Sequence, residues 1–142
     1  MYLAGPSLRE YWGKERAGSV TPLRTYIDSG IRVSSGTDSA VIPYPPLWTF
    51  YHFVTRDTIS GGVFGPEQRI TREEALRLAT INNAYLNFEE DIKGSLEPGK
   101  FADLVVLSDD IITCPARRIR DMTVLMTMVN GKMVYEHKDF KP

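Results

Sequence analysis

A single cysteine, Cys114, occurs among the 142 residues of the sequence. One cysteine excludes a disulfide within the chain, and it excludes zinc sites that are built from two or more cysteines. The sequence therefore favours a reducing compartment. The first ten residues also lack the basic start and apolar stretch of a secretory leader, so we expect a cytoplasmic protein.

Long apolar runs and an excess of either charge are missing too. No window approaches the roughly 20 apolar residues that a helix needs to cross a bilayer. The 17 Lys and Arg residues against 18 Asp and Glu residues give a formal net charge of −1. A nearly neutral chain without charge runs makes nucleic acid and anionic membrane surfaces unsuitable as partners.

Histidine is scarce, because the chain has only His52 and His137. Neither has a second histidine or a cysteine at the spacing of a zinc site. His52 lies in a predicted helix, where a packing or capping role is favoured, and His137 lies in a polar tail. We therefore expect the isolated chain to hold no metal cofactor.

The composition, 42% hydrophobic and 25% charged, is that of a soluble protein with one core. The first part of the chain combines helices with a strand. A short helix is predicted over residues 7–12, and Thr21 followed by Pro22 opens another helix that ends at Gly30. Residues 31–35 then form a predicted strand, an order typical of an α/β protein with parallel strands.

Two further helices are predicted before the chain changes character. Residues 45–56 place their apolar side chains on one face of a helix. After a flexible loop at residues 61–66, Thr71 and Glu74 form a capping box, in which each side chain accepts a hydrogen bond from a backbone N–H group at the helix start. This helix is predicted to run to about Asn83.

The last third of the sequence has the pattern of a small antiparallel sheet. Pro98 and Gly99 occupy the middle of a predicted type II turn, which leads into a strand over residues 103–107. The pair Asn130-Gly131 predicts a two-residue type I′ hairpin between two strands within residues 124–135.

Several motifs together resemble the amidohydrolase superfamily. Its C-terminal signature is similar to residues 94–107, Gly-Ser-Leu-Glu-Pro-Gly-Lys-Phe-Ala-Asp-Leu-Val-Val-Leu, followed by the hairpin at 124–135. The helical segments 71–76 and 80–85 match the stretch before that signature. Within the superfamily the chain looks most like the family-3 branch, which includes N-substituted formamide deformylases. Three segments carry this likeness: residues 13–17, Gly-Lys-Glu-Arg-Ala; 36–39, Gly-Thr-Asp-Ser; and 88–96, Phe-Glu-Glu-Asp-Ile-Lys-Gly-Ser-Leu.

The resemblance implies a (β/α)8 barrel that carries a composite β-sandwich built from both chain ends. Residues 1–93 would form the C-terminal portion of the barrel, with its last helices and its eighth strand at residues 31–35. Residues 94–142 would supply the C-terminal strands of the sandwich. Because a barrel of this type needs about 250 residues, we expect the chain to be a C-terminal fragment.

The resemblance also assigns a catalytic role to Asp38, at the end of the implied eighth strand. There the carboxylate contacts the metal and accepts the proton of the metal-bound water. A divalent cation lowers the pKa of its water toward about 7, so a nearby carboxylate can complete the deprotonation and return the proton to the leaving nitrogen. The alternative is that Asp38 is a turn residue, whose carboxylate accepts hydrogen bonds from backbone N–H groups. The family's other metal ligands, including a His-x-His pair, are absent from this sequence.

Three further residues are candidates for substrate binding. Arg16 matches a charged position of the family pattern, although placement on the surface is an equal alternative. Thr37 adjoins Asp38 and can shape its loop, with turn formation as the alternative. Trp48 can line a pocket near the mouth of the implied barrel, although an aromatic residue at helical spacing is usually part of the core.

These features predict part of a metal-dependent hydrolase that acts on non-peptide carbon–nitrogen bonds, such as those of an amide, a formamide or a cyclic amide. In the complete protein a divalent metal, zinc by expectation, would be the cofactor and a small molecule the substrate. The isolated chain would be inactive. The alternative is a non-catalytic assembly or interaction module, and in either case exposed sheet edges favour a homo-oligomer.

Overall fold

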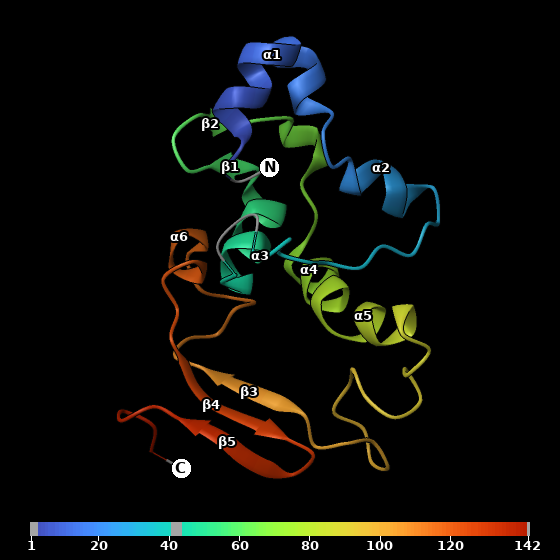
Figure 1. The fold of residues 1–142 in the computed structure, drawn as a ribbon, viewed down its shortest axis with the longest axis vertical. Helices are drawn as coiled ribbons and strands as arrows, with labels where there is room; N and C mark the ends of the chain where they lie inside the picture. Colours follow the sequence, from blue (N-terminus) through green and yellow to red (C-terminus); the bar gives the residue numbers. More distant parts are fainter. Residues whose placement is uncertain (1–2, 41–43, 142) are drawn as a thin grey trace.

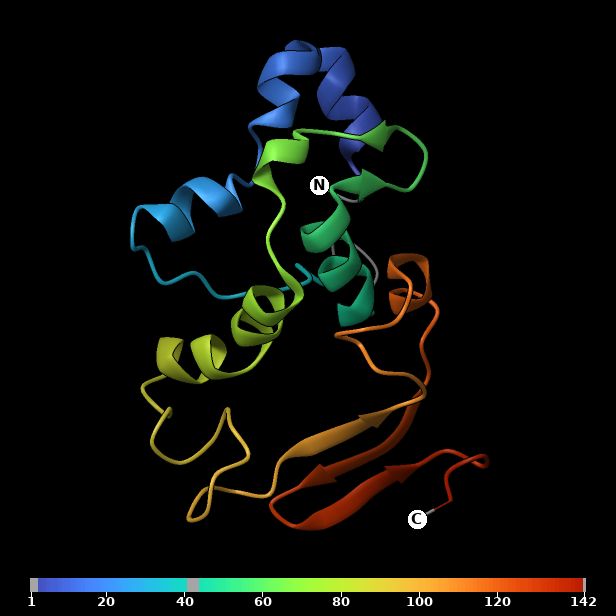
Figure 2. The same cartoon turned by 180° about the vertical axis from the view of Figure 1, so that it is seen from behind.

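The computed structural model describes residues 3–40 and 44–141, which form a mixed α/β structure (Figure 1). Figures 1 and 2 place the C-terminal sheet and the first helix at opposite ends of the molecule. The elements, in chain order, are α1 (Gly5–Gly18), α2 (Leu23–Asp28), α3 (Pro46–Thr55), β1 (Asp57–Thr58), β2 (Gly62–Val63), the 3-10 helix η1 (Pro66–Gln68), α4 (Arg72–Ala79), α5 (Ile81–Leu86), β3 (Leu104–Leu107), α6 (Ala116–Ile119), β4 (Val124–Val129) and β5 (Lys132–Glu136). No helix in the described part of the chain is long and apolar enough to cross a membrane.

The first two helices differ from the prediction at their ends. The short helix expected over 7–12 forms as part of the longer α1, which is kinked at Gly13, where φ is 75° and ψ is 166°. Thr21, the expected cap of α2, has φ of 56°, and the residue at the cap position is Pro22, without a side-chain cap bond. The predicted end of this helix is confirmed, because Gly30 follows it with φ of 75°, a conformation that glycine adopts at little cost.

The strand expected over residues 31–35 is wrong for this structure, since the described residues give it no strand partner. Its polar groups bond to helices instead. The backbone N–H of Ser35 donates to the carbonyl oxygen of Leu78 at 3.2 Å, and the Asn82 side-chain amide donates to the carbonyl oxygen of Val33 at 2.7 Å. A strand exists only through its ladder of bonds to a neighbour, so the sequence pattern alone does not produce one.

Helix α3 has the predicted extent and forms the centre of the core. It packs against α4 and α6, and Figure 1 shows it between these two helices. One buried cluster joins its aromatic side chains to residues from α2, α4 and the C-terminal half of the chain. The members of this cluster are Leu23, Phe50, Tyr51, Phe53, Ile70, Ala75, Leu78, Cys114 and Ile119.

The capping box of α4 is confirmed. The Thr71 hydroxyl accepts a bond from the Glu74 backbone N–H at 3.1 Å, and the Glu74 carboxylate accepts one from the Thr71 backbone N–H at 2.7 Å. The predicted continuous helix to Asn83 is wrong, because α4 ends at Ala79 and α5 begins after Thr80. The Thr80 hydroxyl donates to the Leu76 carbonyl at 2.7 Å, and such a bond back to the preceding turn often bends a helix.

The C-terminal sheet agrees with the sequence pattern. Strands β3, β4 and β5 are antiparallel neighbours in that order. Gly99, in the predicted type II turn, has φ of 94°, and the Lys100 N–H donates to the Glu97 carbonyl at 3.2 Å. Asn130 and Gly131 have φ of 47° and 74°, the pair of positive values that a type I′ hairpin requires.

Candidate functional site

Asp38 lies on an exposed turn that follows the segment tethered to α4 and α5. Its backbone is left-handed, with φ of 56°, a conformation that aspartate tolerates better than most residues. The turn is anchored at Ser35, whose backbone N–H lies 3.2 Å from the Asn83 side-chain oxygen as well as bonding to α4. The Asp38 carboxylate is therefore exposed to solvent, and the backbone just before it is anchored to α4 and α5 by hydrogen bonds.

A small cavity of about 130 Å³ lies beside this turn and includes the predicted candidate Thr37 in its wall. The other walls come from α3, α4 and α5. No charged residue lines the cavity; the lining residues are Ser35, Gly36, Thr37, Pro46, Thr49, Phe50, Phe53, Ala75, Ala79 and Asn83. Its chemistry is that of an apolar pocket with hydroxyl and amide groups, which can orient a neutral polar group but cannot balance a charge.

The other two candidates do not adjoin this cavity. Arg16 is exposed on α1, where its guanidinium donates to the Trp12 carbonyl at 3.1 Å. Trp48 is half-buried on α3 and packs against the core cluster. The structure thus places Thr37 in the wall of the cavity, and it places Arg16 and Trp48 in the surface and core settings that were their alternatives.

The residues present do not fit a divalent metal by themselves. Within residues 3–40 and 44–141, no three His, Cys, Asp or Glu side chains lie together as a possible ligand group. His52 is only 2% exposed, and its Nδ1 lies 2.8 Å from the Asp57 carbonyl oxygen. His137 lies in the C-terminal tail, 3.6 Å from the Asp139 carboxylate. Asp38 would thus be a single ligand of any metal.

Burial makes His52 a source of acid sensitivity. Burial lowers the pKa of the His52 imidazole to about 4, against a smaller upward effect of its bond to the Asp57 carbonyl, and the positive charge of Arg56 adds a lesser downward effect. The unfolded chain takes up a proton near pH 6.5, whereas the folded chain resists protonation until about pH 4. Stability is therefore lost as the pH falls from 6.5 toward 4, by about 3 kcal/mol from this residue.

Urea unfolding at pH 7 and pH 4.5 measures this loss. His52→Gln, which has no proton to gain in this range, should reduce the difference in unfolding free energy between the two pH values. An unchanged difference would show that other groups cause the acid sensitivity.

Sequence reasoning missed Arg56, which is 0% exposed and follows α3. Its guanidinium donates to the carbonyl oxygens of Phe64, Thr21 and Gly18, each at 3.0 Å, and of Val20 at 2.8 Å. These bonds join the end of α1 to the segment after β2. No sequence signal could have found this contact set, because its acceptors are backbone atoms.

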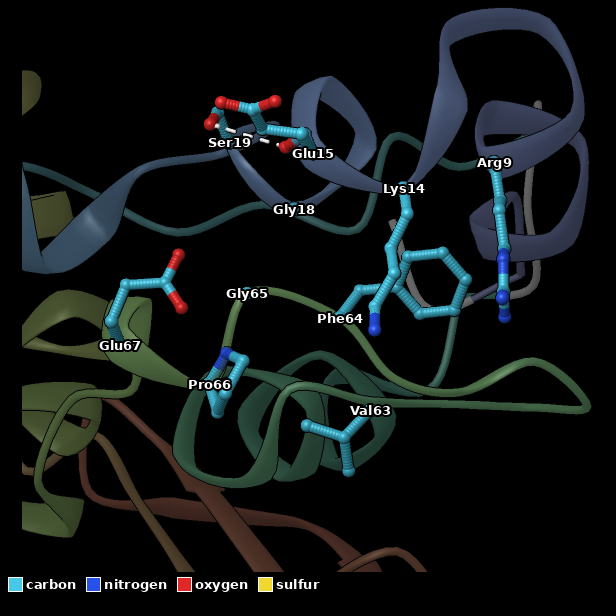
Figure 3. A pocket seen from close by; sticks show the side chains of 10 residues that line it. All are labelled: Arg9, Lys14, Glu15, Gly18, Ser19, Val63, Phe64, Gly65, Pro66 and Glu67. Atoms are coloured by element: carbon cyan, nitrogen blue, oxygen red, sulfur yellow. Dashed lines mark hydrogen bonds between the residues drawn. The ribbon is translucent and has the colours of Figure 1, made fainter.

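A second cavity, of about 420 Å³, lies between these two segments (Figure 3). Its walls come from α1 and from the chain that runs from the end of β2 into η1, and no residue of its lining belongs to the smaller cavity. Acidic and basic side chains both line it, unlike the cavity beside Asp38. None of its lining residues was among the candidate site residues taken from the sequence.

Comparisons with known proteins give one consistent family. Residues 2–135 match the model of the Amidohydrolase family, Amidohydro_3. The N-substituted formamide deformylase of Arthrobacter pascens is 34% identical over 143 residues, covering 94% of this chain and 26% of the deformylase. The putative amidohydrolase YtcJ of Bacillus subtilis is 28% identical over 127 residues, covering 87% of this chain and 24% of its own length.

The fold has a counterpart among solved structures. An amidohydrolase from Thermotoga maritima superposes with a TM-score of 0.60 at 24% identity, over 81% of this chain and 26% of that protein. The chain thus spans about a quarter of the length of the relatives that it matches.

Proposed function

The chain belongs to family 3 of the amidohydrolases, and from that premise we propose that it supplies the proton-transfer carboxylate of a hydrolase acting on non-peptide carbon–nitrogen bonds. The substrate would be a small amide, formamide or cyclic amide. The observation that carries the proposal is the exposed, left-handed Asp38 turn, inside a chain that matches the family over residues 2–135. The same proposal places the protein in the cytoplasm, in keeping with its single, buried cysteine.

In this proposal residues 1–93 are the C-terminal portion of a (β/α)8 barrel, and residues 94–142 are strands of a composite β-sandwich. The likeness to the Thermotoga maritima structure supports this assignment. Residues 31–35 would become the eighth strand where neighbouring barrel strands offer a ladder of hydrogen bonds in place of the bonds to helices that the segment makes here.

Asp38 would act as a base and then as an acid. Its carboxylate accepts a proton from the attacking water and returns it to the nitrogen of the leaving amine, which lets the carbon–nitrogen bond break. Its exposed position on a tethered turn suits contact with a substrate. Thr37 would help to shape the loop, and the divalent metal, zinc in this proposal, would have to be held by residues that the described part of this chain does not provide.

A hybrid enzyme tests the proposal. The segment of the Arthrobacter pascens deformylase that aligns with this chain would be replaced by residues 1–142, and hydrolysis of an N-substituted formamide would be followed by amine release. We expect turnover well above that of the deformylase truncated before the segment. A hybrid that is folded and metal-loaded but has no turnover would reject the catalytic proposal.

The isolated chain should gain no stability from zinc. With no group of three possible ligands among its described residues, we expect its Tm to rise by less than about 1 °C in excess zinc. If the chain had a zinc site, zinc at 100 times the Kd of that site would instead raise the free energy of unfolding by about 3 kcal/mol. A saturable rise at one zinc per chain, seen by calorimetry, would contradict the assignment of the missing ligands to other residues.

The alternative function, a non-catalytic assembly module, is favoured by one feature of the sheet. All five residues of β5 are exposed on the sheet's edge, including Val134 at 61% and Tyr135 at 45%. An exposed edge strand of this kind is a template for pairing with another chain. We propose that the chain forms homo-oligomers through this edge.

Light scattering over a range of concentrations tests the edge. The average molecular mass of the native chain should rise with concentration. The mass of Val134→Lys should stay at the value of a monomer, because a charged side chain on an edge strand disfavours pairing. Leu96→Lys, at an exposed position outside the sheet, is the matched control and should still associate. A native chain that stays monomeric would reject the edge as an interface.

A further inference from the structure

We propose that the 420 Å³ cavity between α1 and the segment after β2 binds a small zwitterion whose carboxylate and ammonium groups are joined by an apolar stem. The volume lies in the range of small-molecule sites, about 300–1,000 Å³. The cavity is separate from the Asp38 turn, so this binding function does not depend on the proposed hydrolysis.

The walls of this cavity are fixed before any ligand arrives. Gly65 has φ of 56°, and a Cβ atom there would overlap the carbonyl oxygen of Gly18, so the close approach of the two backbones requires glycine at position 65. Arg56 donates to the carbonyl oxygens of Gly18 and Phe64, each at 3.0 Å, and thereby ties one wall to the other. A preformed cavity loses little conformational entropy when it binds.

Charge is distributed unevenly around the cavity (Figure 3). Arg9 and Lys14 flank the ring of Phe64, with the Arg9 guanidinium 6.0 Å from the ring centroid. Glu67 lies toward the other end, beyond Gly65, whereas the Glu15 carboxylate points away from the gap between Gly18 and Gly65. None of these four charged groups forms an ion pair with another residue that the structure describes.

This distribution selects the class of ligand. A molecule with an anionic group at each end would meet Glu67, and one with a cationic group at each end would meet Arg9 and Lys14. A zwitterion places its carboxylate at the basic end and its ammonium group at the acidic end, so both contacts are attractive. Its stem would span the distance between these two ends of the cavity.

The probe is 6-aminohexanoate, titrated into the full chain while backbone amide signals are followed by NMR. We expect saturable shifts at Gly18 and Gly65 with a Kd of about 1–10 mM, the range for a ligand of this size. Hexanoate and hexylammonium have the same stem with a single charge and should bind at least tenfold more weakly. Equal binding of hexanoate, or no saturable shift in a folded chain, would overturn the proposal.

Two exposed side chains provide the variants. Lys14→Met and Glu67→Gln should each weaken 6-aminohexanoate binding about tenfold, the loss of one charge contact. Lys138→Met, at an exposed position in the C-terminal tail after β5, removes a charge of the same sign as Lys14→Met and should leave the Kd unchanged. Circular dichroism establishes that each variant is folded. If all three variants bind as the native chain does, the shifts report general charge attraction and the proposed site is wrong.

Discussion

Replacing Arg56 with methionine should lower the free energy of unfolding by about 3–5 kcal/mol. The guanidinium is completely buried and donates to four backbone carbonyl oxygens, at 2.8–3.0 Å. Methionine fills a similar volume but donates no hydrogen bond, so the carbonyl groups would lose their partners away from water. Because domains are stable by only about 5–15 kcal/mol, this single loss would remove a large share of the stability.

The measurement is urea unfolding of the native chain, Arg56→Met and a matched control. Arg69→Met is that control, because Arg69 is exposed and donates to one carbonyl oxygen, that of Thr55, at 2.9 Å. We expect the control to lose less than about 1 kcal/mol. Arg56→Lys should fall between the two, since an ammonium group cannot match the fan of a guanidinium. Similar losses in both methionine variants would contradict a special role for Arg56.

The parts of the fold that were predictable from sequence depend on neighbouring residues alone. The positive φ angles of Asn130 and Gly131 follow from the chemistry of a two-residue turn. The capping box follows in the same way from Thr71 and Glu74, which lie three residues apart and satisfy each other's backbone groups. Such features need no knowledge of the rest of the chain.

The errors arose where the outcome depends on distant partners. Residues 31–35 have a strand's composition, but their hydrogen bonds go to α2, α4 and α5, because the described chain offers them no neighbouring strand. The break at Thr80 depends on a hydroxyl that bonds to the preceding turn and not to solvent. The spacing of apolar residues therefore predicts neither the hydrogen-bond partners of residues 31–35 nor the helix break at Thr80.

In the candidate site, too, local features were predictable and features that depend on packing were not. The sequence identified the Asp38 turn, since an aspartate in a glycine-containing segment is a local signal that the family resemblance reinforced. It gave no means to place Arg16 or Trp48, whose surroundings depend on how α1 and α3 pack. The 420 Å³ cavity was out of reach as well, because its walls come from segments that are about 45 residues apart in the chain.

Replacing Asp38 with asparagine in the hybrid enzyme should lower kcat by about a thousandfold or more. Asparagine has nearly the same shape and also tolerates the left-handed backbone at this position, where φ is 56°. The turn should therefore persist. The amide can still accept a hydrogen bond from water, but it cannot take the proton and pass it to the leaving nitrogen.

The outcome is measured as the initial rate of amine release, with metal content determined for each preparation. Asp91→Asn is the matched control, because Asp91 is also exposed and its change alters the net charge equally. That variant should keep its kcat. If Asp38→Asn retains full turnover at full metal content, Asp38 is only a turn residue, because a side chain that moves the proton cannot be replaced by one that is unable to hold it.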